Sequence, residues 1–570
     1  MRRALILRTR ILCGFFIAAA LLLIIRLYFV QVVHGGAYRK DATAQYVEQS
    51  PDTGDRGSIY FTSKDGQFVS AAVMQTGYRI AIRPADIVDA MEVYSHLSAA
   101  TPIDRDRFMA SAAKKADPWE DVAFRASEDA ASQIRQLKLP GVLLVSDQWR
   151  FYPAHDLAAQ TVGFVGYQGD TKTGVYGLER SWQDTLSHTS QTRYVNPFAE
   201  IFTNMAALVA NDPSSHEGSI ITSIEPTVAA QLGKTLDGVM RLYTPKIAGG
   251  IVMDPHSGEV IAMEVRPAFD PNTYGTVSNP SVYSNPLVEG AYEMGSIMKP
   301  LTMAAGIDVG AVTPKTLYED RGCIERSGKK ICNYDGKARG VVPMQEVLNQ
   351  SLNTGAAFVV DTMGHNVFGE YVHAYALGEK TGIDLPNEAR GQISSIDEGY
   401  DVDYASAAFG QGIAVSPIEM TRALASLAND GVLPSPHVVT GIKYDSGVTR
   451  RVETGVGSRV LTATSTETIT NMLVTVFDNA LLKGELKMNH YSIAAKTGTA
   501  QIAIPGGGGY YADRYLHSFF GYFPAHDPKF IVFFFAVEPH GAEFASATLA
   551  HPFSDIAKFL INYYNLPPDR

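Results

Sequence analysis

Residues 292–303 read Tyr292-Glu-Met-Gly-Ser-Ile-Met-Lys-Pro-Leu-Thr-Met303, and they place Ser296 and Lys299 in an S-x-x-K spacing. Gly295 suits a helix start, and Pro300 is tolerated in a first turn. Residues three apart share a helix face, so the Lys299 amine can reach the Ser296 hydroxyl. A serine hydroxyl needs such a base to become a nucleophile, and burial together with a second cation lowers a lysine pKa enough to provide it. The stretch therefore predicts a nucleophilic serine on a helix, in an apolar setting, with another lysine arriving from elsewhere.

That second lysine is expected from a K-T-G triplet, of which the chain has three copies, at Lys172, Lys380 and Lys496. Lys172 lies between turn residues, and Lys380 is expected at a helix end with a C-terminal glycine. Lys496 belongs to the extended, apolar run 491–504. Because a strand presents alternate side chains on one face, Lys496 and its neighbours are predicted to line one wall of a cleft. The backbone N–H groups of Thr499 and Ser296 then form a candidate oxyanion hole.

An S-x-N triplet, Ser351-Leu-Asn353, lies between the other two motifs and is expected on a loop between helices. S-x-x-K, S-x-N and K-T-G in this order form a known set for serine acyl transfer. Each motif alone is weak, and S-x-x-K also occurs at Ser111 with Lys114 and at Ser327 with Lys330. The first of these is polar and far upstream, and the second contains a glycine and is typical of a turn. The sequence therefore favours Ser296.

An apolar run at residues 11–33 precedes all three motifs and is long enough to cross a bilayer as a helix. Arg26 lies near its exit end, where its side chain can extend to the interface. Four arginines precede the run, so the N-terminus is expected in the cytoplasm and the rest outside. A cleaved signal peptide is the alternative, but its apolar region would be shorter and no cleavage site follows Val33. The next apolar run, Phe530–Val537, has the length of a buried strand.

Length and charge set the domain organisation. The 570 residues are too many for one ordinary domain, and a net charge of −11 argues against nucleic acid as a partner. A strand from Ser219, a helix beginning at Pro226 and a hairpin at 249–263 mark a change in pattern. We therefore predict a cytoplasmic tail (1–10), a transmembrane anchor (11–33), a non-catalytic pedestal (34–225) and a catalytic domain (226–570).

Two of the three cysteines, Cys323 and Cys332, flank what looks like a tight hairpin. Outside the cytoplasm a disulfide between them is expected. A zinc site that also uses Asp335 is the alternative, although two cysteines do not fill four ligand positions. Cys13 lies within the predicted anchor.

With these motifs in place, the chain resembles the class B penicillin-binding proteins, which are monofunctional peptidoglycan transpeptidases. Met294 departs from the resemblance, because a proline is common there. The likeness covers most of the chain and includes segments besides the three motifs: Tyr292–Ser296, Gly382–Pro386, Phe409–Pro417 and Ser518–Pro524 in the catalytic part, and Arg56–Ile59, Arg150–Pro153 and Gly174–Glu179 in the pedestal. The resemblance implies an α/β fold with an antiparallel sheet flanked by helices and an all-α subdomain, preceded by a mixed α+β pedestal and one transmembrane helix.

The resemblance also implies roles for the site residues. Ser296 would attack the penultimate D-Ala carbonyl of a stem peptide ending in D-Ala-D-Ala, and Lys299 would take its proton. Ser351 and Asn353 would relay protons and orient the donor peptide. The K-T-G segment, including Gly498, would bind the donor: Lys496 and Thr497 would hold its carboxylate, and Thr499 would contribute to the oxyanion hole and to donor binding. An amine from a neighbouring stem would then attack the acyl-enzyme, β-lactams would acylate Ser296, and no metal or cofactor would be needed.

Within the family, the chain length and the Ser-Leu-Asn motif favour the division-specific, FtsI-like branch, with the elongation-specific branch as the alternative. The implied partners are a glycosyltransferase of the FtsW/RodA kind and other membrane proteins of the division machinery. The enzyme would lie in the bacterial cytoplasmic membrane with its catalytic domain outside. A serine β-lactamase, a penicillin-sensing receptor and an inactive division scaffold are rival classes. The β-lactamase and the receptor fit the length and the single anchor less well, and the intact motif set argues against the scaffold.

Overall fold

The computed structural model describes residues 47–49, 56–169, 171–187, 192–194, 217–444, 447–455 and 457–570. The predicted tail and anchor lie outside these residues. In the described part, no helix combines the length and apolar character that a membrane span requires. Residues Arg56–Ser187 and Gly218–Arg570 form one compact unit. The other unit contains β1 (Val47–Gln49) and β8 (Thr192–Tyr194), which pair antiparallel.

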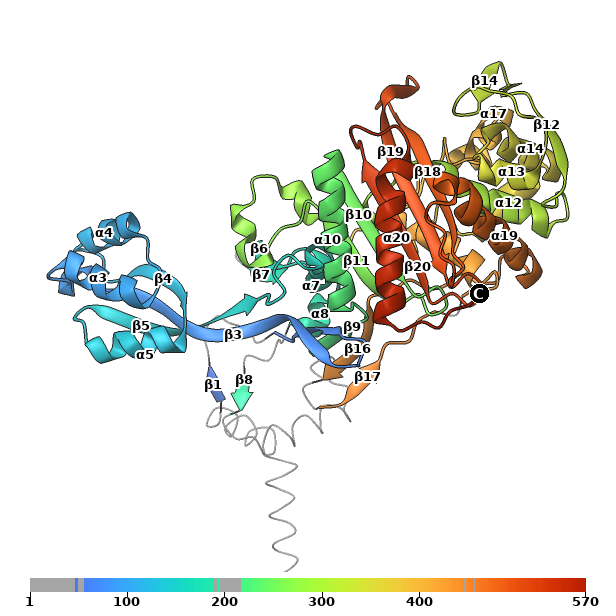
Figure 1. Cartoon of the computed structure of the whole chain (residues 1–570). Coiled ribbons are helices and arrows are strands. Elements are labelled where there is room, and N and C mark those ends of the chain that lie inside the picture. Colours follow the sequence, from blue (N-terminus) through green and yellow to red (C-terminus); the bar gives the residue numbers. More distant parts are fainter. Residues whose placement is uncertain are drawn as a thin grey trace, which may run out of the picture. The chain divides into compact units, whose positions relative to one another are not determined.

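A five-stranded antiparallel sheet forms the centre of the catalytic part (Figure 1). The predicted hairpin and the buried apolar strand are both confirmed and lie side by side in it. In spatial order its strands are β11 (Val260–Arg266), β10 (Ile247–Met253), β20 (Phe530–Val537), β19 (Tyr510–Phe523) and β18 (Ala494–Ala503).

Helices cover both faces of this sheet. Two long helices, α10 (Pro226–Tyr243) and α20 (Ala545–Tyr563), pack on one face (Figure 1). Gly249 and Gly250 show the alternation, because a Cβ on Gly250 would come 2.9 Å from Leu232 of α10, whereas one on Gly249 would come 3.0 Å from Leu287 on the other face. That other face carries α11 (Pro286–Glu289), α18 (Pro417–Ala425) and the 3-10 helix η6 (Gly295–Met298).

A mostly helical subdomain continues from η6. Its central helix, α12 (Lys299–Asp308), is buried along its first eight residues and packs against α14 and α19. The other helices are α13 (Met344–Asn349), α14 (Asn353–Met363), α15 (His365–Ala374), α16 (Ser394–Asp397), α17 (Asp401–Ala407) and α19 (Ala463–Thr475). Two small hairpin-like sheets accompany them, made of β12 (Leu317–Asp320) with β15 (Gly340–Pro343) and of β13 (Cys323–Arg326) with β14 (Lys329–Cys332).

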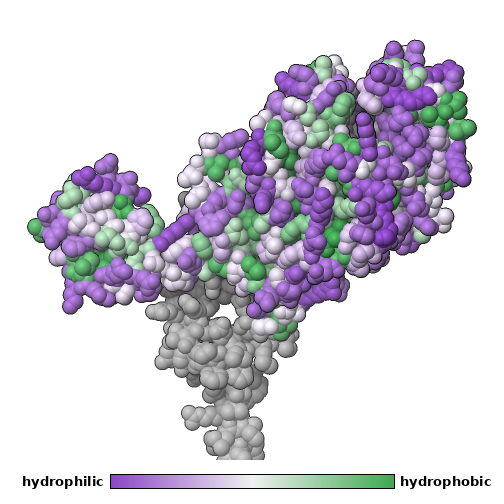
Figure 2. All heavy atoms as spheres, viewed as in Figure 1, coloured by the Kyte–Doolittle hydropathy of each residue, from purple (hydrophilic) through white to green (hydrophobic). Residues whose placement is uncertain are grey.

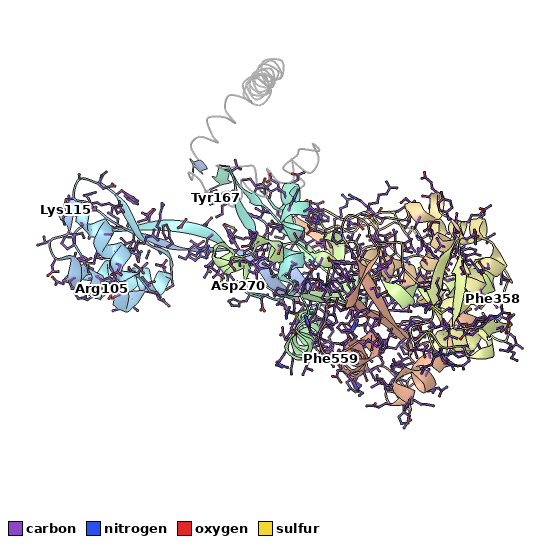
Figure 3. The ribbon with its side chains drawn as sticks, turned by 90° about the horizontal axis from the view of Figure 1, so that it is seen from above. Arg105, Lys115, Tyr167, Asp270, Phe358 and Phe559 are labelled. Atoms are coloured by element: carbon purple, nitrogen blue, oxygen red, sulfur yellow. A yellow bond between two sulfur atoms is a disulfide. The ribbon has the colours of Figure 1, made fainter. Side chains whose placement is uncertain are left out.

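The pedestal is built on a seven-stranded mixed sheet. Its longest strand, β3 (Phe68–Ile82), pairs with β2 through its first half and with β4 and β5 through its second half. The other strands are β2 (Ile59–Thr62), β4 (Glu120–Ala126), β5 (Val142–Phe151), β9 (Gly218–Thr222), β16 (Val439–Tyr444) and β17 (Thr449–Arg451). At the far end of β3, the helices α3 (Ala90–Ala100), α4 (Arg105–Ala113) and α5 (Glu128–Leu137) enclose a hydrophobic core of their own. Figure 3 labels Arg105 in this lobe.

The pedestal sheet takes strands from both sides of the predicted boundary at residues 225 and 226. β16 and β17 follow that boundary in sequence, yet β16 pairs with β9. A side-chain contact also crosses this boundary, because His155 Nδ1 and Asp270 Oδ2 lie 2.9 Å apart. Figure 3 labels Asp270. The boundary stays a prediction, because both sides pack into one compact unit.

The three pedestal segments that carry the family resemblance meet at one buried carboxylate. Glu179 Oε2 accepts from Arg56 Nε, and Glu179 Oε1 accepts from Arg150 Nε, both over 2.6 Å. The two guanidinium groups outweigh burial and hold the Glu179 pKa below its usual value. The sequence motifs in the pedestal therefore mark a structural ion cluster. On the face of the molecule that Figure 2 shows, the surface is mainly hydrophilic with small hydrophobic patches.

Candidate active site

Ser296 lies in η6, immediately before α12, as the sequence predicted for a helix start. A 3-10 helix has about three residues per turn, so residues three apart are stacked on one another. This geometry places Ser296 directly over Lys299, the first residue of α12. Ser296 is half-buried, whereas the Lys299 side chain is almost fully buried, with 1% of its surface exposed.

Glycines allow η6 to lie directly against the sheet edge. Gly295 has a φ of +64°, a region that favours glycine, and a Cβ there would come 2.9 Å from the Thr499 carbonyl oxygen. A Cβ on Gly498 would come 2.3 Å from Ser518 Oγ and 2.6 Å from the Met294 carbonyl oxygen. Gly498 thus permits the contact between β18 and the segment that carries Ser296.

The second lysine arrives from β18, the edge strand of the catalytic sheet. Lys496 is buried, whereas Thr497 and Thr499 are half-buried on alternate positions of the strand. The Thr499 hydroxyl accepts a hydrogen bond from the Ala545 N–H over 3.0 Å, which ties this strand to the start of α20. The strand predicted for Lys496 is therefore present, with its threonines on the half-exposed face.

Ser351 connects the two lysines. Lys299 Nζ donates to Ser351 Oγ over 3.1 Å and to the Ser351 carbonyl oxygen over 2.6 Å. Lys496 Nζ donates to the same Oγ over 3.1 Å and to the Thr497 carbonyl oxygen. Ser351 lies on the predicted loop, between α13 and α14, with a φ of +54°. This uncommon backbone conformation turns the residue so that both its oxygens face the lysines.

The protonation of the two lysines is shifted toward the neutral form. Burial holds the Lys299 pKa well below its ordinary value, and the positive charge of Lys496 adds to the effect. Burial lowers the pKa of Lys496 to about 7. A neutral amine can therefore exist near neutral pH one turn from Ser296, as a general base requires.

Asn353, the fourth residue expected at the site, is hydrogen-bonded to another segment. It is the first residue of α14, and its Nδ2 donates to the Cys332 carbonyl oxygen over 2.9 Å. Among the described residues, Lys299, Ser351 and Lys496 are connected by hydrogen bonds between their side chains. Ser296 lies next to Lys299 because of the 3-10 turn, and its side chain makes no hydrogen bond to these three described residues.

Cys323 and Cys332 form a disulfide, as expected, across the β13–β14 pair. The bond uses both sulfurs, so the zinc alternative at these two residues is excluded. Because the Cys332 carbonyl receives the Asn353 amide, the disulfide hairpin supports the S-x-N loop. Sequence reasoning missed this link, since no local pattern connects two segments that are 21 residues apart.

The other copies of the motifs lie elsewhere. Ser111 and Lys114 both bind Glu120, over 2.9 Å and 2.6 Å, so this lysine is held as an ion pair. Ser327, with a φ of +47°, lies in the turn between β13 and β14, as predicted.

The other two K-T-G lysines differ in outcome: turn residues flank Lys172 as expected, whereas the helix end expected at Lys380 was wrong. Lys172 belongs to β7 (Thr171–Gly174), which pairs with β6 (Val165–Gln168), because the flanking turn residues close a hairpin. Lys380 lies in a loop beyond the end of α15 at Ala374 and not at the helix end, because the chain turns before Gly378.

His517 is a further buried residue beside the site that sequence reasoning did not single out. It pairs with Thr499 across β18 and β19. Its Nδ1 lies 2.9 Å from Thr548 Oγ1 and its Nε2 lies 3.1 Å from the Glu543 carbonyl oxygen. Burial lowers its pKa to about 4. The only sequence signal was its place next to Ser518 in the segment that carries the resemblance.

Comparison with known proteins agrees with this geometry. The protein-family model described as the penicillin binding protein transpeptidase domain matches residues 248–558, which is more than half of the chain. Stage V sporulation protein D of Bacillus subtilis is 26% identical, covering 92% of this chain and 81% of its own length. Peptidoglycan D,D-transpeptidase FtsI of Escherichia coli is 24% identical, covering 99% and 92%.

A solved structure shows the same fold. Penicillin-binding protein 3 of Mycobacterium tuberculosis, in complex with aztreonam, superposes with a TM-score of 0.69 at 22% identity, over 91% of this chain and 98% of that one. The chain therefore belongs to the penicillin-binding protein transpeptidase family, a family of serine acyltransferases, as a class B, FtsI-like member.

Proposed function

We propose that this protein is a membrane-anchored peptidoglycan D,D-transpeptidase that cross-links stem peptides through an acyl-enzyme on Ser296. The observation that supports this most is the shared contact of Lys299 and Lys496 with Ser351, one 3-10 turn from a half-buried serine. Two buried lysines next to a hydroxyl are costly for stability, and such perturbed groups are typical of catalytic sites.

In the first half-reaction, neutral Lys299 takes the proton of Ser296, and Ser296 Oγ attacks the penultimate D-Ala carbonyl of the donor. The backbone N–H groups of Ser296 and Thr499 stabilise the oxyanion of the tetrahedral intermediate. The C–N bond to the terminal D-Ala then breaks, and the leaving amine takes a proton that Ser351 relays from Lys299. The products are the acyl-enzyme and free D-Ala.

In the second half-reaction, the amine of a neighbouring stem attacks the ester carbonyl of the acyl-enzyme. The amine loses a proton through Ser351 and Lys299, the C–O bond to Ser296 breaks, and Ser296 recovers its proton. Lys496 and Thr497 hold the terminal carboxylate of the donor only until that carboxylate leaves with D-Ala in the first half-reaction, and Asn353 orients the donor backbone. Gly498 contributes through its small size, because it keeps β18 against η6.

We further propose a role in septal wall synthesis, with residues 11–33 as the anchor in the cytoplasmic membrane and the catalytic domain outside. The match to FtsI along 99% of this chain and the Ser-Leu-Asn motif support this role. The pedestal, with its separate lobe at the far end of β3, offers surfaces for a glycosyltransferase of the FtsW/RodA kind and other division proteins.

Labelling with a fluorescent penicillin, followed by mass spectrometry of the labelled peptide, tests the mechanism. We expect a stable adduct on Ser296 that the Ser296→Ala variant lacks. Rapid release of hydrolysed penicillin would indicate a β-lactamase instead, and labelling that survives the substitution would contradict the mechanism. Depletion in the parent bacterium should block septation and leave elongation intact; rounded cells would point to the elongation branch.

A further inference from the structure

Glu293, three residues before Ser296, carries a carboxylate that the mechanism above does not use. Its Oε1 accepts a hydrogen bond from the Tyr510 hydroxyl over 3.2 Å. Its Oε2 is buried and has no hydrogen-bond partner among the residues that the structure describes. Burial raises the Glu293 pKa, and the Tyr510 hydroxyl and then the Gly412 N–H oppose this only in part. A buried polar atom without a partner is unfavourable, so it requires an explanation.

Glu293 and the two lysines belong to separate hydrogen-bonded sets around Ser296. The lysines meet at Ser351, whereas Glu293 meets Tyr510 and Gly412. Gly412 is also close to the serine segment, because the Gly410 carbonyl two residues earlier accepts from the Gly295 N–H over 3.1 Å. The segment around Ser296 therefore lies near basic groups, the two lysines, and near one acidic group, Glu293.

The two substrates of a transpeptidase differ in charge in the same way. The donor ends in a carboxylate, which suits the lysines. The acceptor brings an amine, which is an ammonium at neutral pH because amines of this kind have a pKa of about 10. A carboxylate with a free oxygen is the group that binds an ammonium best, through a charge-assisted hydrogen bond.

We propose that Glu293 binds the amine of the acceptor stem peptide and that Tyr510 covers this carboxylate until the acceptor arrives. The inference rests on the proposed function and names the residue that selects its second substrate. Glu293 holds the acceptor nitrogen near the ester on Ser296, and the bound ammonium releases one proton to solvent before the neutral amine attacks. The donor carboxylate that Lys496 and Thr497 held has by then left with D-Ala. Electrostatic complementarity thus separates the two stem peptides, which are otherwise similar in composition.

Tyr510 is well placed to move. It is 37% exposed and is the first residue of β19, directly after the run Gly506–Gly509. Each of these four glycines has a positive φ, and a Cβ on any of them would meet nothing within 4 Å. The hairpin between β18 and β19 extends past the neighbouring strands (Figure 1). Its open tip lets the Tyr510 side chain swing away without displacing packed neighbours.

The test separates the two half-reactions in the purified full chain. Acylation is followed with a fluorescent penicillin. Transfer is followed with a small thioester donor and a stem peptide that carries a free side-chain amine, by measuring the ratio of aminolysis to hydrolysis of the acyl-enzyme. In Glu293→Gln we expect this ratio to fall by about tenfold, the size of one lost hydrogen bond to a charged group. Acylation should change by less than about twofold in comparison.

Three further variants complete the test. Glu293→Asp should restore part of the transfer ratio, because it restores the charge. Glu543 is exposed and lies near β18, the strand that carries Lys496. Glu543→Gln removes one negative charge there and should leave the ratio of aminolysis to hydrolysis unchanged. Tyr510→Phe removes the covering hydroxyl and should lower the acceptor concentration needed for half-maximal transfer.

The outcomes distinguish this inference from the proposed function. A wild-type chain that is not acylated at Ser296 would remove the proposed function itself. An acylated wild type with an unchanged transfer ratio in Glu293→Gln would overturn the inference alone. Equal losses of acylation and transfer in Glu293→Gln, or a loss in Tyr510→Phe as large as that in Glu293→Gln, would show a structural role and would also overturn it.

Discussion

Lys299 and Lys496 donate to the same acceptor, the hydroxyl oxygen of Ser351, each over 3.1 Å. Two ammonium groups this close repel each other, and both are buried. The arrangement is therefore stable only if one of them is neutral for much of the time. Ser351 is the group through which a proton can pass between them, so catalysis depends on the protonation of the pair and not of one lysine alone.

The first prediction concerns the pH dependence of acylation. Lys299 must be neutral to act as a base, so the rate should rise with pH as the pair loses a proton. Because burial lowers both pKa values, and that of Lys496 to about 7, we expect the rise far below the ordinary lysine value of about 10.4. Stopped-flow measurement of penicillin acylation between pH 5 and 10 tests this.

Lys496→Gln provides the control for the same prediction. Without the positive charge of Lys496, the pKa of Lys299 should increase, so the residual acylation rate should rise at higher pH than in the wild type. An unchanged inflection, or one that moves to lower pH, would contradict the coupling between the two amines.

The catalytic part was largely predictable because its signals are local. A short turn between two apolar runs identified β10 and β11, and eight apolar residues identified β20. The strand predicted for the run around Lys496 is also present, as β18. The motif spacing predicted the placement of Ser296, because a spacing of three residues brings Ser296 over Lys299 in either kind of helix.

The contacts that complete the site were not predictable, because they join distant segments. The donation of both lysines to one oxygen depends on the positive φ of Ser351, which no neighbouring residue signals. The Asn353 amide finds its acceptor in the disulfide hairpin. The pairing of β16 with β9 joins residues more than 200 positions apart, and sequence periodicity carries no information about such a partner.

The second prediction concerns Gly498. In Gly498→Ala the new Cβ would lie 2.6 Å from the Met294 carbonyl oxygen, so η6 must move away from β18. Displacing a reacting group by about 1 Å can lower a rate by about a hundredfold, and we expect a loss of acylation of this size. Gly238→Ala on α10 is the matched control, since its Cβ would meet nothing. Similar acylation rates in both variants would contradict the close packing at Gly498.

The third prediction concerns the disulfide. Replacing both Cys323 and Cys332 by serine frees a loop of ten residues, which should lower the free energy of unfolding by about 2–3 kcal/mol. Acylation should also slow, because the Cys332 carbonyl holds the Asn353 amide. Denaturant unfolding and penicillin labelling measure the two effects. A reducing agent should reproduce both in the wild type and change nothing in the double variant; a wild type that is insensitive to reduction would contradict the role of the bond.

The fourth prediction concerns His517, which is fully buried between β19 and α20. Its pKa is lowered from 6.5 to about 4 in the folded chain, because burial disfavours the imidazolium. Between these two values the unfolded chain binds a proton that the folded chain does not, so the free energy of unfolding must decrease as the pH falls through this window. The full shift corresponds to at most about 3 kcal/mol.

Many carboxylates titrate in the same range, so the difference between wild type and His517→Gln isolates this residue. Chemical unfolding at several pH values should give a smaller decrease for the variant, with the two curves converging toward pH 4. Parallel curves would mean that the pKa of His517 is the same in the folded and unfolded chains, which would contradict the lowering by burial.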